Sequence, residues 1–390
     1  MRKTRMLIDG NNMAYRMLHT HGTLRTPKGI PTGVLYGTLN ALKSLINAYS
    51  PSEVLFAWDS RGSWRKDNLF AEYKSKRHER VRSPEEEARY DEFFKVELPL
   101  VKRALSGLGI PQMEMQGLEA DDLILGVVKY LYHTEIENLI VSTDKDFVQM
   151  VQWPTTRVLN PTTDKVYQRD DRRKSVMYGA DEIAPCGVSY LARRMLIGDA
   201  SDSIPGVRGI GEKRAAAHLN IPVHAHGLGW DTRQDNYDIL REYIVKQHSM
   251  LKRGAVIDNL NIAIRDGTLR RNYDLMSLLD VPKERVALMG YVSQRAYFLR
   301  ISTLYLRNCH KNMPQYGDLL SYDYAKKRSM SNMMFNKFSR FFGALGFRWA
   351  LLGDSSLQMQ AMYGELSLAR NAHVFPLVRE TIQQYRRLPE

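Results

Sequence analysis

The sequence predicts an α/β fold in which a central, mostly parallel β-sheet is flanked by helices. Short apolar runs typical of buried strands alternate with helical patterns along the first half of the chain, as they do in parallel sheets. Three of these runs end in or just before an aspartate: Asp9, Asp59 and Asp144. Functional sites of open α/β sheets lie at the carboxyl ends of the strands, so we expect these carboxylates to gather there.

The expected elements follow in chain order. The strands are predicted from apolar runs at residues 6–9, 54–59 and 139–142. Helices are expected at residues 33–49, 84–108 and 119–132, with Pro84 and Gly107 near the ends of the second one. From about residue 176 the pattern becomes helical and stays so, with a loop at residues 220–235 and a mainly helical stretch at 286–390.

Composition narrows the class of protein. A chain of 390 residues is too long for one small core and suggests two or more units. The net charge of +13 favours a polyanionic partner, either nucleic acid or an anionic membrane surface, although a merely soluble basic protein fits the charge equally well.

Cysteine usage and hydropathy exclude other classes. The two cysteines, Cys186 and Cys309, provide neither a disulfide framework nor a cysteine-based zinc site. The apolar run at the N-terminus is too short for a signal peptide, and no stretch approaches the roughly 18 apolar residues of a membrane span. We therefore expect a reducing cytoplasmic or nuclear setting without membrane attachment.

The motif Gly-Leu-Glu-Ala-Asp-Asp at residues 117–122 opens a predicted helix. An acidic first turn is an ordinary feature there, because the helix dipole favours negative charge. However, a capping role needs one acid and not three, and Glu119 and Asp122 share one helix face at i and i+3.

Two further motifs carry paired aspartates. Asp144 and Asp146 follow the third predicted strand, where an Asx turn is the simpler interpretation. Asp199 and Asp202 precede a Pro-Gly turn, where a helix end would explain them. Each motif alone is a weak signal.

Taken together, these acids form an all-oxygen ligand set, which suits Mg²⁺ or Mn²⁺ rather than zinc. The set comprises Asp9, Asp59, Glu119, Asp121, Asp122, Asp144, Asp146, Asp199 and Asp202. Nine carboxylates exceed the needs of one magnesium ion and fit two or more. Two ions about 4 Å apart activate a water and stabilise the leaving oxygen of a phosphodiester.

The ordered motifs resemble the flap endonuclease / 5′–3′ exonuclease family over roughly residues 6–280. Within it, the likeness is to bacteriophage 5′ nucleases and to the 5′-nuclease domain of bacterial DNA polymerase I. The matching motifs lie at residues 7–12, 29–37, 56–59, 73–77, 119–122, 144–146 and 198–202. The resemblance implies a PIN-like core, two Mg²⁺ ions that Mn²⁺ can replace, and a cytoplasmic location, in the host if the chain is phage-encoded.

The resemblance also implies roles for the acids. Asp9, Asp59, Glu119, Asp121 and Asp122 would line the more buried ion. The second ion would be served mainly by Asp144, Asp146, Asp199 and Asp202, with Asp146 also expected as a catalytic residue. All nine positions are filled, so the motif does not indicate an inactive enzyme.

Eight Lys and Arg residues between Arg61 and Arg82, interleaved with three aromatics, favour contact with phosphates and unpaired bases. A solvated basic helix is the alternative. The resemblance makes residues 61–95 a helical arch, in which Lys74 and Arg77 contact the scissile phosphate as catalytic cations. Further nucleic-acid contacts are expected from Arg16, Tyr73 and Lys76.

A Gly-rich stretch at residues 206–216 enters a helix, where backbone amides can hold a phosphate. A plain turn is the alternative. The spacing resembles a helix-hairpin-helix motif, which in this family grips duplex backbone and commonly binds K⁺. Gly209, Gly211, Lys213 and Arg214 are its expected nucleic-acid contacts.

We therefore expect a 5′-nuclease core at residues 1–197, a helix-hairpin-helix region at 198–285 and a helical extension at 286–390. The extension could be packed helices, additional DNA contact or a dock for a replication protein. The predicted function is a monomeric, structure-selective 5′ nuclease acting on branched or nicked DNA, RNA primers or RNA–DNA hybrids. The alternatives are a PIN-like endoribonuclease, which typically lacks the arch and hairpin, and a non-catalytic junction-binding protein.

Overall fold

The computed structural model describes residues 3–26, 29–60, 62–65, 69–75, 82–107, 110–115, 117–130, 136–170, 175–219, 236–249 and 254–278. The chain divides into two compact units. Among the described residues, the first unit is drawn from Met1–Trp58 and Arg82–Met113, and the second from Asp59–Val81 and Glu114–Tyr291. Each unit is described separately below.

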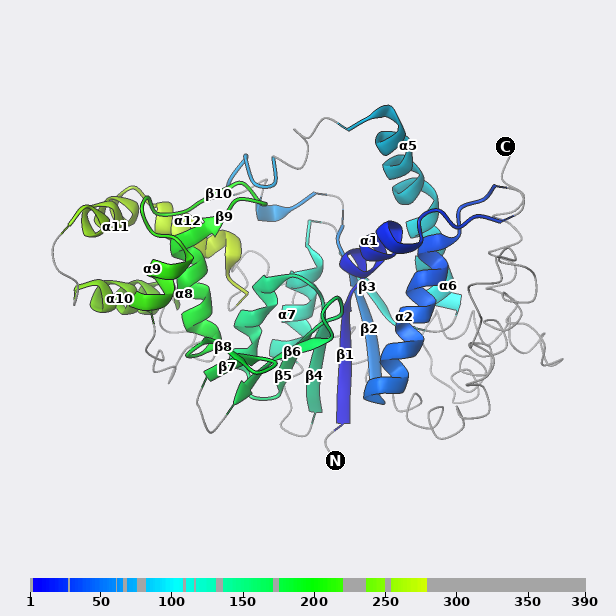
Figure 1. Ribbon diagram of the computed structural model, residues 1–390, viewed down its shortest axis with the longest axis horizontal. Coiled ribbons are helices and arrows are strands. Elements are labelled where there is room, and N and C mark those ends of the chain that lie inside the picture. The colour runs from blue at the N-terminus through cyan, green and yellow to red at the C-terminus, as the bar shows by residue number, and fades with distance from the viewer. Residues whose placement is uncertain are drawn as a thin grey trace. The chain divides into compact units, whose positions relative to one another are not determined.

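The first unit is built on parallel strands. β1 (Lys3–Asp9) pairs with β2 (Glu53–Trp58), with Leu7 opposite Leu55 and Asp9 opposite Ala57. β3 (Gln112–Glu114) is the other neighbour of β2. Both long strands are almost wholly buried, which explains why they appear in the sequence as continuous apolar runs. Figure 1 shows the pair in blue, with the helices of the same unit beside it.

Helices cover these strands. α1 (Gly10–His21) follows β1 directly, and α2 (Gly33–Tyr49) matches the predicted helix at 33–49. The predicted helix at 84–108 is present as α5 (Pro84–Glu92), a π-helical turn η1 (Phe93–Glu97) and α6 (Leu98–Gly107). Ser83 and Glu86 form a capping box that starts α5.

The second unit contains strands in both directions. β4 (Ile136–Val141) and β5 (Thr156–Asn160) are parallel. β6 (Lys165–Asp170), β7 (Ser175–Tyr178) and β8 (Asp181–Ala184) continue from β5 as an antiparallel meander. The prediction of helix from residue 176 is therefore wrong up to the start of α8, because residues 175–178 and 181–184 are paired strands joined by a turn.

Helices form the rest of the second unit. They are α7 (Ala120–Tyr130), the 3₁₀ helix η2 (Lys145–Gln152), α8 (Gly187–Ile197), α9 (Glu212–His218), α10 (Asn236–Ser249), α11 (Ala255–Arg265) and α12 (Thr268–Met276). Two-residue strands β9 (Gly198–Asp199) and β10 (Ile204–Pro205) close the loop between α8 and α9. The buried Asn272 side chain joins β10 to the end of α8, because its Nδ2 donates to Met195 O at 2.9 Å and to Pro205 O at 2.8 Å.

The predicted α/β class is confirmed, with a mixed rather than mostly parallel set of strands. The loop expected at 220–235 and the extension at 286–390 lie outside the described residues. The three predicted domain boundaries stay predictions. Within the described part of the chain, no helix combines the length and apolarity needed to cross a membrane.

Candidate active site

Asp9 ends β1 and begins α1 in the first unit. Its Oδ1 accepts a hydrogen bond from Asn12 N at 3.0 Å, so the carboxylate caps the helix. This ionisable side chain is only 9% exposed. Arg16 lies two turns along the same helix, where partial burial lowers its pKa. The role of Asp9 in metal binding and the role of Arg16 in DNA binding stay predictions.

The first acid cluster consists of Asp59, Glu119, Asp121 and Asp122, all in the second unit. Asp59 Oδ1 accepts from Ala120 N at 2.8 Å and thereby caps α7. The three other acids occupy the residue before α7 and its first turn. The start of a single helix therefore brings three of the predicted ligands together, and the hydrogen bond to Ala120 N adds Asp59 from a distant part of the sequence.

Arg65 is the cation of this cluster. Its Nη1 lies 2.9 Å from Glu119 Oε2, and its Nη2 lies 2.9 Å from Asp122 Oδ1 and 3.3 Å from Asp121 Oδ2. The Arg65 side chain is only 1% exposed. The sequence placed Arg65 among the basic residues of the arch that face phosphates, whereas the structure buries it against carboxylates.

Lys74 and Tyr73 also contact Glu119. Lys74 Nζ lies 2.5 Å from Glu119 Oε1, and Tyr73 Oη donates to Glu119 Oε2 at 3.1 Å. Lys74 has a left-handed backbone at φ +60°, and its amide donates to Asp202 O at 2.9 Å. Tyr73 is buried in this state, so its ring is not displayed for the predicted base stacking. Lys76 and Arg77 lie outside the described residues.

The pKa values in the first cluster diverge. Burial alone would raise the pKa of Glu119, but Arg65 and Lys74 outweigh it and lower that pKa to about 2. Burial raises the pKa of Asp121 well above its usual value, and repulsion from Asp122 and Glu119 adds to this against the attraction of Arg65. Ionisation of Asp121 is therefore disfavoured in the absence of a further cation.

The second acid cluster consists of Asp144, Asp146, Asp199 and Asp202. Asp144 caps η2, since its Oδ1 accepts from Asp146 N at 2.8 Å. Asp199 ends β9, where its Oδ1 accepts from Ser201 N at 2.8 Å. Burial raises the pKa of Asp146 to about 7, and the three other carboxylates contribute by repulsion.

Arg194, in the last turn of α8, is the cation of the second cluster. It forms an ion pair with Asp199, and its Nε lies 3.5 Å from Asp146 Oδ1. Its side chain is 16% exposed. Arg194 was not predicted as a site residue, although its place one turn before the Gly198-Asp199 step was a usable signal.

The clusters fit divalent cations by their chemistry. All donors are carboxylate oxygens, which Mg²⁺ and Mn²⁺ prefer. The raised pKa values of Asp121, Asp144 and Asp146 show that burial and mutual repulsion oppose ionisation there, which a cation would relieve. In the described residues, however, no three acidic, His or Cys side chains are arranged to hold a metal ion as they stand. The arginines and Lys74 take the carboxylate oxygens instead.

The predicted hairpin lies between β10 and α9. Gly209 has φ +83°, a conformation that favours glycine, and Gly211 caps α9 with open space where a side chain would be. Arg214 Nη1 donates to Gly209 O at 2.7 Å, and Asn259 Nδ2 of α11 donates to Arg208 O at 3.0 Å. The hairpin is thus held from both sides, while Lys213 is exposed to solvent.

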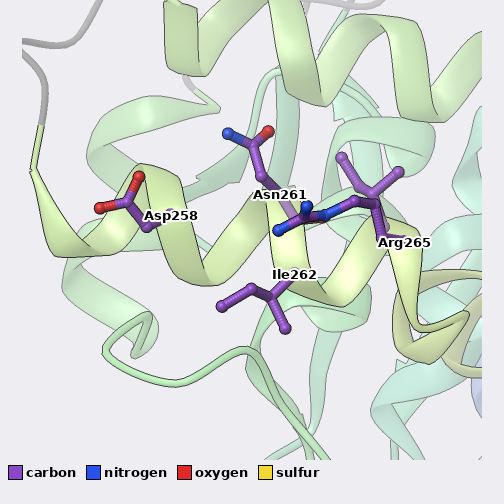
Figure 2. Close-up of a pocket in the computed structure, with 5 residues that line it drawn as sticks. Asp258, Asn261, Ile262 and Arg265 are labelled. Atoms are coloured by element: carbon purple, nitrogen blue, oxygen red, sulfur yellow. The ribbon is translucent and has the colours of Figure 1, made fainter.

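A separate open pocket of about 560 Å³ lies along α11 (Figure 2). Its lining consists of Asp258, Asn261, Ile262, Ile264 and Arg265. It contains none of the predicted acids. The candidate active site is therefore defined by the acid clusters and not by this pocket.

The α/β fold and the paired acid clusters agree with the nuclease core that the sequence predicts. Residues 4–177 match the family model "5'-3' exonuclease, N-terminal resolvase-like domain". A 5′–3′ exonuclease of Aquifex aeolicus is 32% identical over 306 residues, which cover 76% of this chain and 100% of that protein. The chain therefore belongs to the 5′–3′ exonuclease family, and the predicted 5′-nuclease function is confirmed at this level.

Two further similarities extend this comparison. DNA polymerase I of Pseudomonas aeruginosa is 33% identical over 214 residues, covering 55% of this chain but only 22% of the polymerase. The solved structure "Divalent metal ions (zinc) bound to T5 5'-exonuclease" has a TM-score of 0.57 at 22% identity and covers 76% of this chain and 99% of that one. This second likeness supports the fold.

Proposed function

We propose that this chain is a divalent-metal-dependent 5′ nuclease that cleaves 5′ flaps and recessed or nicked 5′ ends of DNA. The observation that carries the proposal is the pair of all-oxygen acid clusters on either side of Lys74. Its Nζ pairs with the Glu119 carboxylate of the first cluster, and its backbone amide donates to the backbone carbonyl of Asp202 in the second. A related structure is described as a flap endonuclease "pseudo-enzyme-product complex with DNA and metal ions". That description supports the choice of substrate class.

The proposed ligands follow the two clusters. The first ion would be held by Asp59, Glu119, Asp121 and Asp122, with Asp9 as the further ligand that the motif predicts. The second would be held mainly by Asp144, Asp146, Asp199 and Asp202. Bound at these carboxylates, Mg²⁺ supplies activation of a water molecule and stabilisation of the leaving oxygen.

The protein's own groups complete the chemistry. Lys74 provides a cation beside the first cluster, where it can stabilise charge that develops on the scissile phosphate. Arg77 is proposed for the same task from the motif. The backbone amides at Gly209 and Gly211, with Lys213 and Arg214, are proposed to bind duplex phosphates without reading sequence.

Other parts of the prediction stand on the sequence alone. These are the preference for Mg²⁺, the K⁺ ion at the hairpin, action on RNA–DNA hybrids, a replication partner for residues 286–390, the monomeric state and the cytoplasmic location. A potassium requirement for duplex binding is the simplest of these to measure.

The test is cleavage of a 5′-labelled flap duplex with Mg²⁺ and with EDTA, with matched single-stranded RNA and intact duplex as comparison substrates. We expect Mg²⁺-dependent cuts at the flap junction that leave a 5′-phosphate. Cleavage of single-stranded RNA without junction preference would support the PIN-like endoribonuclease. Tight flap binding without any metal-dependent cleavage would support the non-catalytic junction-binding protein.

A further inference from the structure

We propose that Arg65 and Arg194 are internal counter-ions, one for each acid cluster, which hold the carboxylates together without metal and which a divalent cation must displace from them. The inference rests on the proposed metal-dependent function and concerns the state of the site before metal binds. It assigns these two arginines a role in setting metal affinity.

The geometry at Arg65 is that of a built cation site. One guanidinium contacts three carboxylates of the first cluster, on Glu119, Asp121 and Asp122, within 3.3 Å. Its side chain is 1% exposed, and Trp64 Nε1 donates to the same Asp122 at 3.0 Å. An arginine that binds the phosphates of DNA must present its guanidinium nitrogens to solvent. Those of Arg65 point at carboxylates of the protein instead, so the contacts favour a role as a counter-ion.

Arg194 repeats this arrangement in the second cluster. It reaches from α8 to Asp199 and Asp146, which belong to two separate acidic motifs. The two arginines come from unrelated parts of the sequence, yet each contacts carboxylates from its own cluster. This repetition indicates a common requirement of the two clusters rather than an isolated ion pair.

That requirement is electrostatic. Several carboxylates gathered in a poorly solvated site repel one another, and removing their cation leaves buried charge unpaired, which is strongly destabilising. In the metal-free protein, an arginine supplies the positive charge that offsets this repulsion. The same oxygen atoms are the proposed ligands of the metal ion, so metal binding and the arginine contacts compete for them.

The affinity for metal therefore depends on how much more strongly the carboxylates interact with the metal ion than with the arginine. Replacing the arginine with a neutral residue removes the competitor and raises the repulsion that the metal relieves. The variant should therefore be less stable without metal, because buried charge is left unpaired, but bind metal more tightly, because no arginine competes for the carboxylates. Added metal should then stabilise the variant more than wild type. A purely structural arginine would lower stability without raising metal affinity.

The experiment uses the full chain and Mg²⁺ alone, without DNA. Isothermal titration calorimetry and thermal unfolding are compared for wild type, Arg65→Gln, Arg194→Gln and the control Arg5→Gln. Arg5 is a matched control because it is also buried, at 3% side-chain exposure, and pairs at 2.6 Å with Glu53, which is not one of the proposed ligands. Arg194→Gln is the safer variant for folding, since its side chain is partly exposed.

We expect the dissociation constant for Mg²⁺ to fall about fivefold in each cluster variant and to stay unchanged in Arg5→Gln. The rise in Tm on adding Mg²⁺ should be larger in the cluster variants than in wild type. Unchanged or weaker Mg²⁺ binding by both folded cluster variants would overturn the inference. If wild type and all variants fail to bind Mg²⁺, the proposed metal dependence is itself wrong, and the inference falls with it.

Discussion

Lys74 Nζ lies 2.5 Å from Glu119 Oε1 and, at the same time, 4.7 Å from the centroid of the Tyr73 ring. The lysine predicted to contact the scissile phosphate is therefore held by a carboxylate of the first acid cluster. Its left-handed backbone, at φ +60°, is part of the same arrangement. The acid cluster therefore fixes the position of the cation that we propose to act in cleavage.

We expect Lys74→Ala to lower the single-turnover cleavage rate on a 5′-flap duplex by about 100-fold or more, because a preorganised cation is lost. Affinity for the flap duplex should change much less. Lys165→Ala is the matched control, since Lys165 also pairs with a carboxylate, Asp181 at 3.9 Å, and lies 5.4 Å from an aromatic centroid, that of Tyr178. Equal rates for the two variants would remove Lys74 from the catalytic account.

Asp59 caps α7 and is also a proposed metal ligand, and two substitutions distinguish these roles. Asn retains an oxygen that can accept the hydrogen bond from Ala120 N, whereas Ala does not. We expect Asp59→Ala to lose about 1 kcal/mol of unfolding free energy and Asp59→Asn distinctly less. Both should lose most cleavage in Mg²⁺. Urea unfolding and flap cleavage measure the two effects, and full activity of Asp59→Asn would contradict its role as a ligand.

The hairpin glycines should respond differently to alanine. Gly209→Ala places a side chain at φ +83° and should cost about 1–2 kcal/mol of stability. Gly211→Ala meets no atom within 4 Å, so the fold should be retained. If the hairpin backbone approaches phosphate closely, Gly211→Ala still weakens duplex binding. Thermal unfolding and fluorescence anisotropy with labelled duplex distinguish these effects. Unchanged duplex affinity of Gly211→Ala would argue against a close approach at that residue.

Glu97 of the first unit should make stability depend on pH. Burial raises its pKa above the ordinary value of 4.5, although Arg89 and the amide of Val34 oppose this. The folded state then holds the proton more tightly than the unfolded state, so stability falls as pH rises from about 4.5 through the folded pKa. Relative to Glu97→Gln, wild type should be less stable at pH 7 than at pH 4.5 in urea unfolding.

Glu92 provides a control of opposite sign. Burial would raise its pKa, but hydrogen bonds and charge from Arg25 and Arg89 lower it below 4.5. Its contribution is present above pH 4.5 and is lost as pH falls through the folded pKa. Relative to Glu92→Gln, wild type should therefore lose stability below pH 4.5. The same pH dependence in both comparisons would contradict the assignment for Glu97.

The elements that were predicted correctly are strands buried along most of their length and helices buried along one face. The helix at residues 33–49 and the presence of β1 and β2 are confirmed, because their burial is visible as periodicity or apolar runs. The antiparallel strands were missed because β6, at Lys165–Asp170, is mostly exposed and polar. Such a strand is specified by pairing with its neighbours rather than by its own composition.

The candidate site was likewise predictable only in part. The acids stood out because they recur in short motifs at strand and helix ends. Arg65 did not, because its carboxylate partner Glu119 lies 54 residues away and nothing local marks an arginine as buried. Its position is a tertiary contact, which one sequence does not reveal.

We propose above all that the carboxylates of the two acid clusters make cleavage depend on a divalent metal. The most direct measurement is the cleavage of a 5′-labelled flap duplex in Mg²⁺ by wild type, Asp146→Asn and the control Asp181→Asn, whose carboxylate is 71% exposed. We expect wild type and Asp181→Asn to cleave alike, and Asp146→Asn to cleave at least about 100-fold more slowly. Equal product yield from wild type and Asp146→Asn would contradict the account.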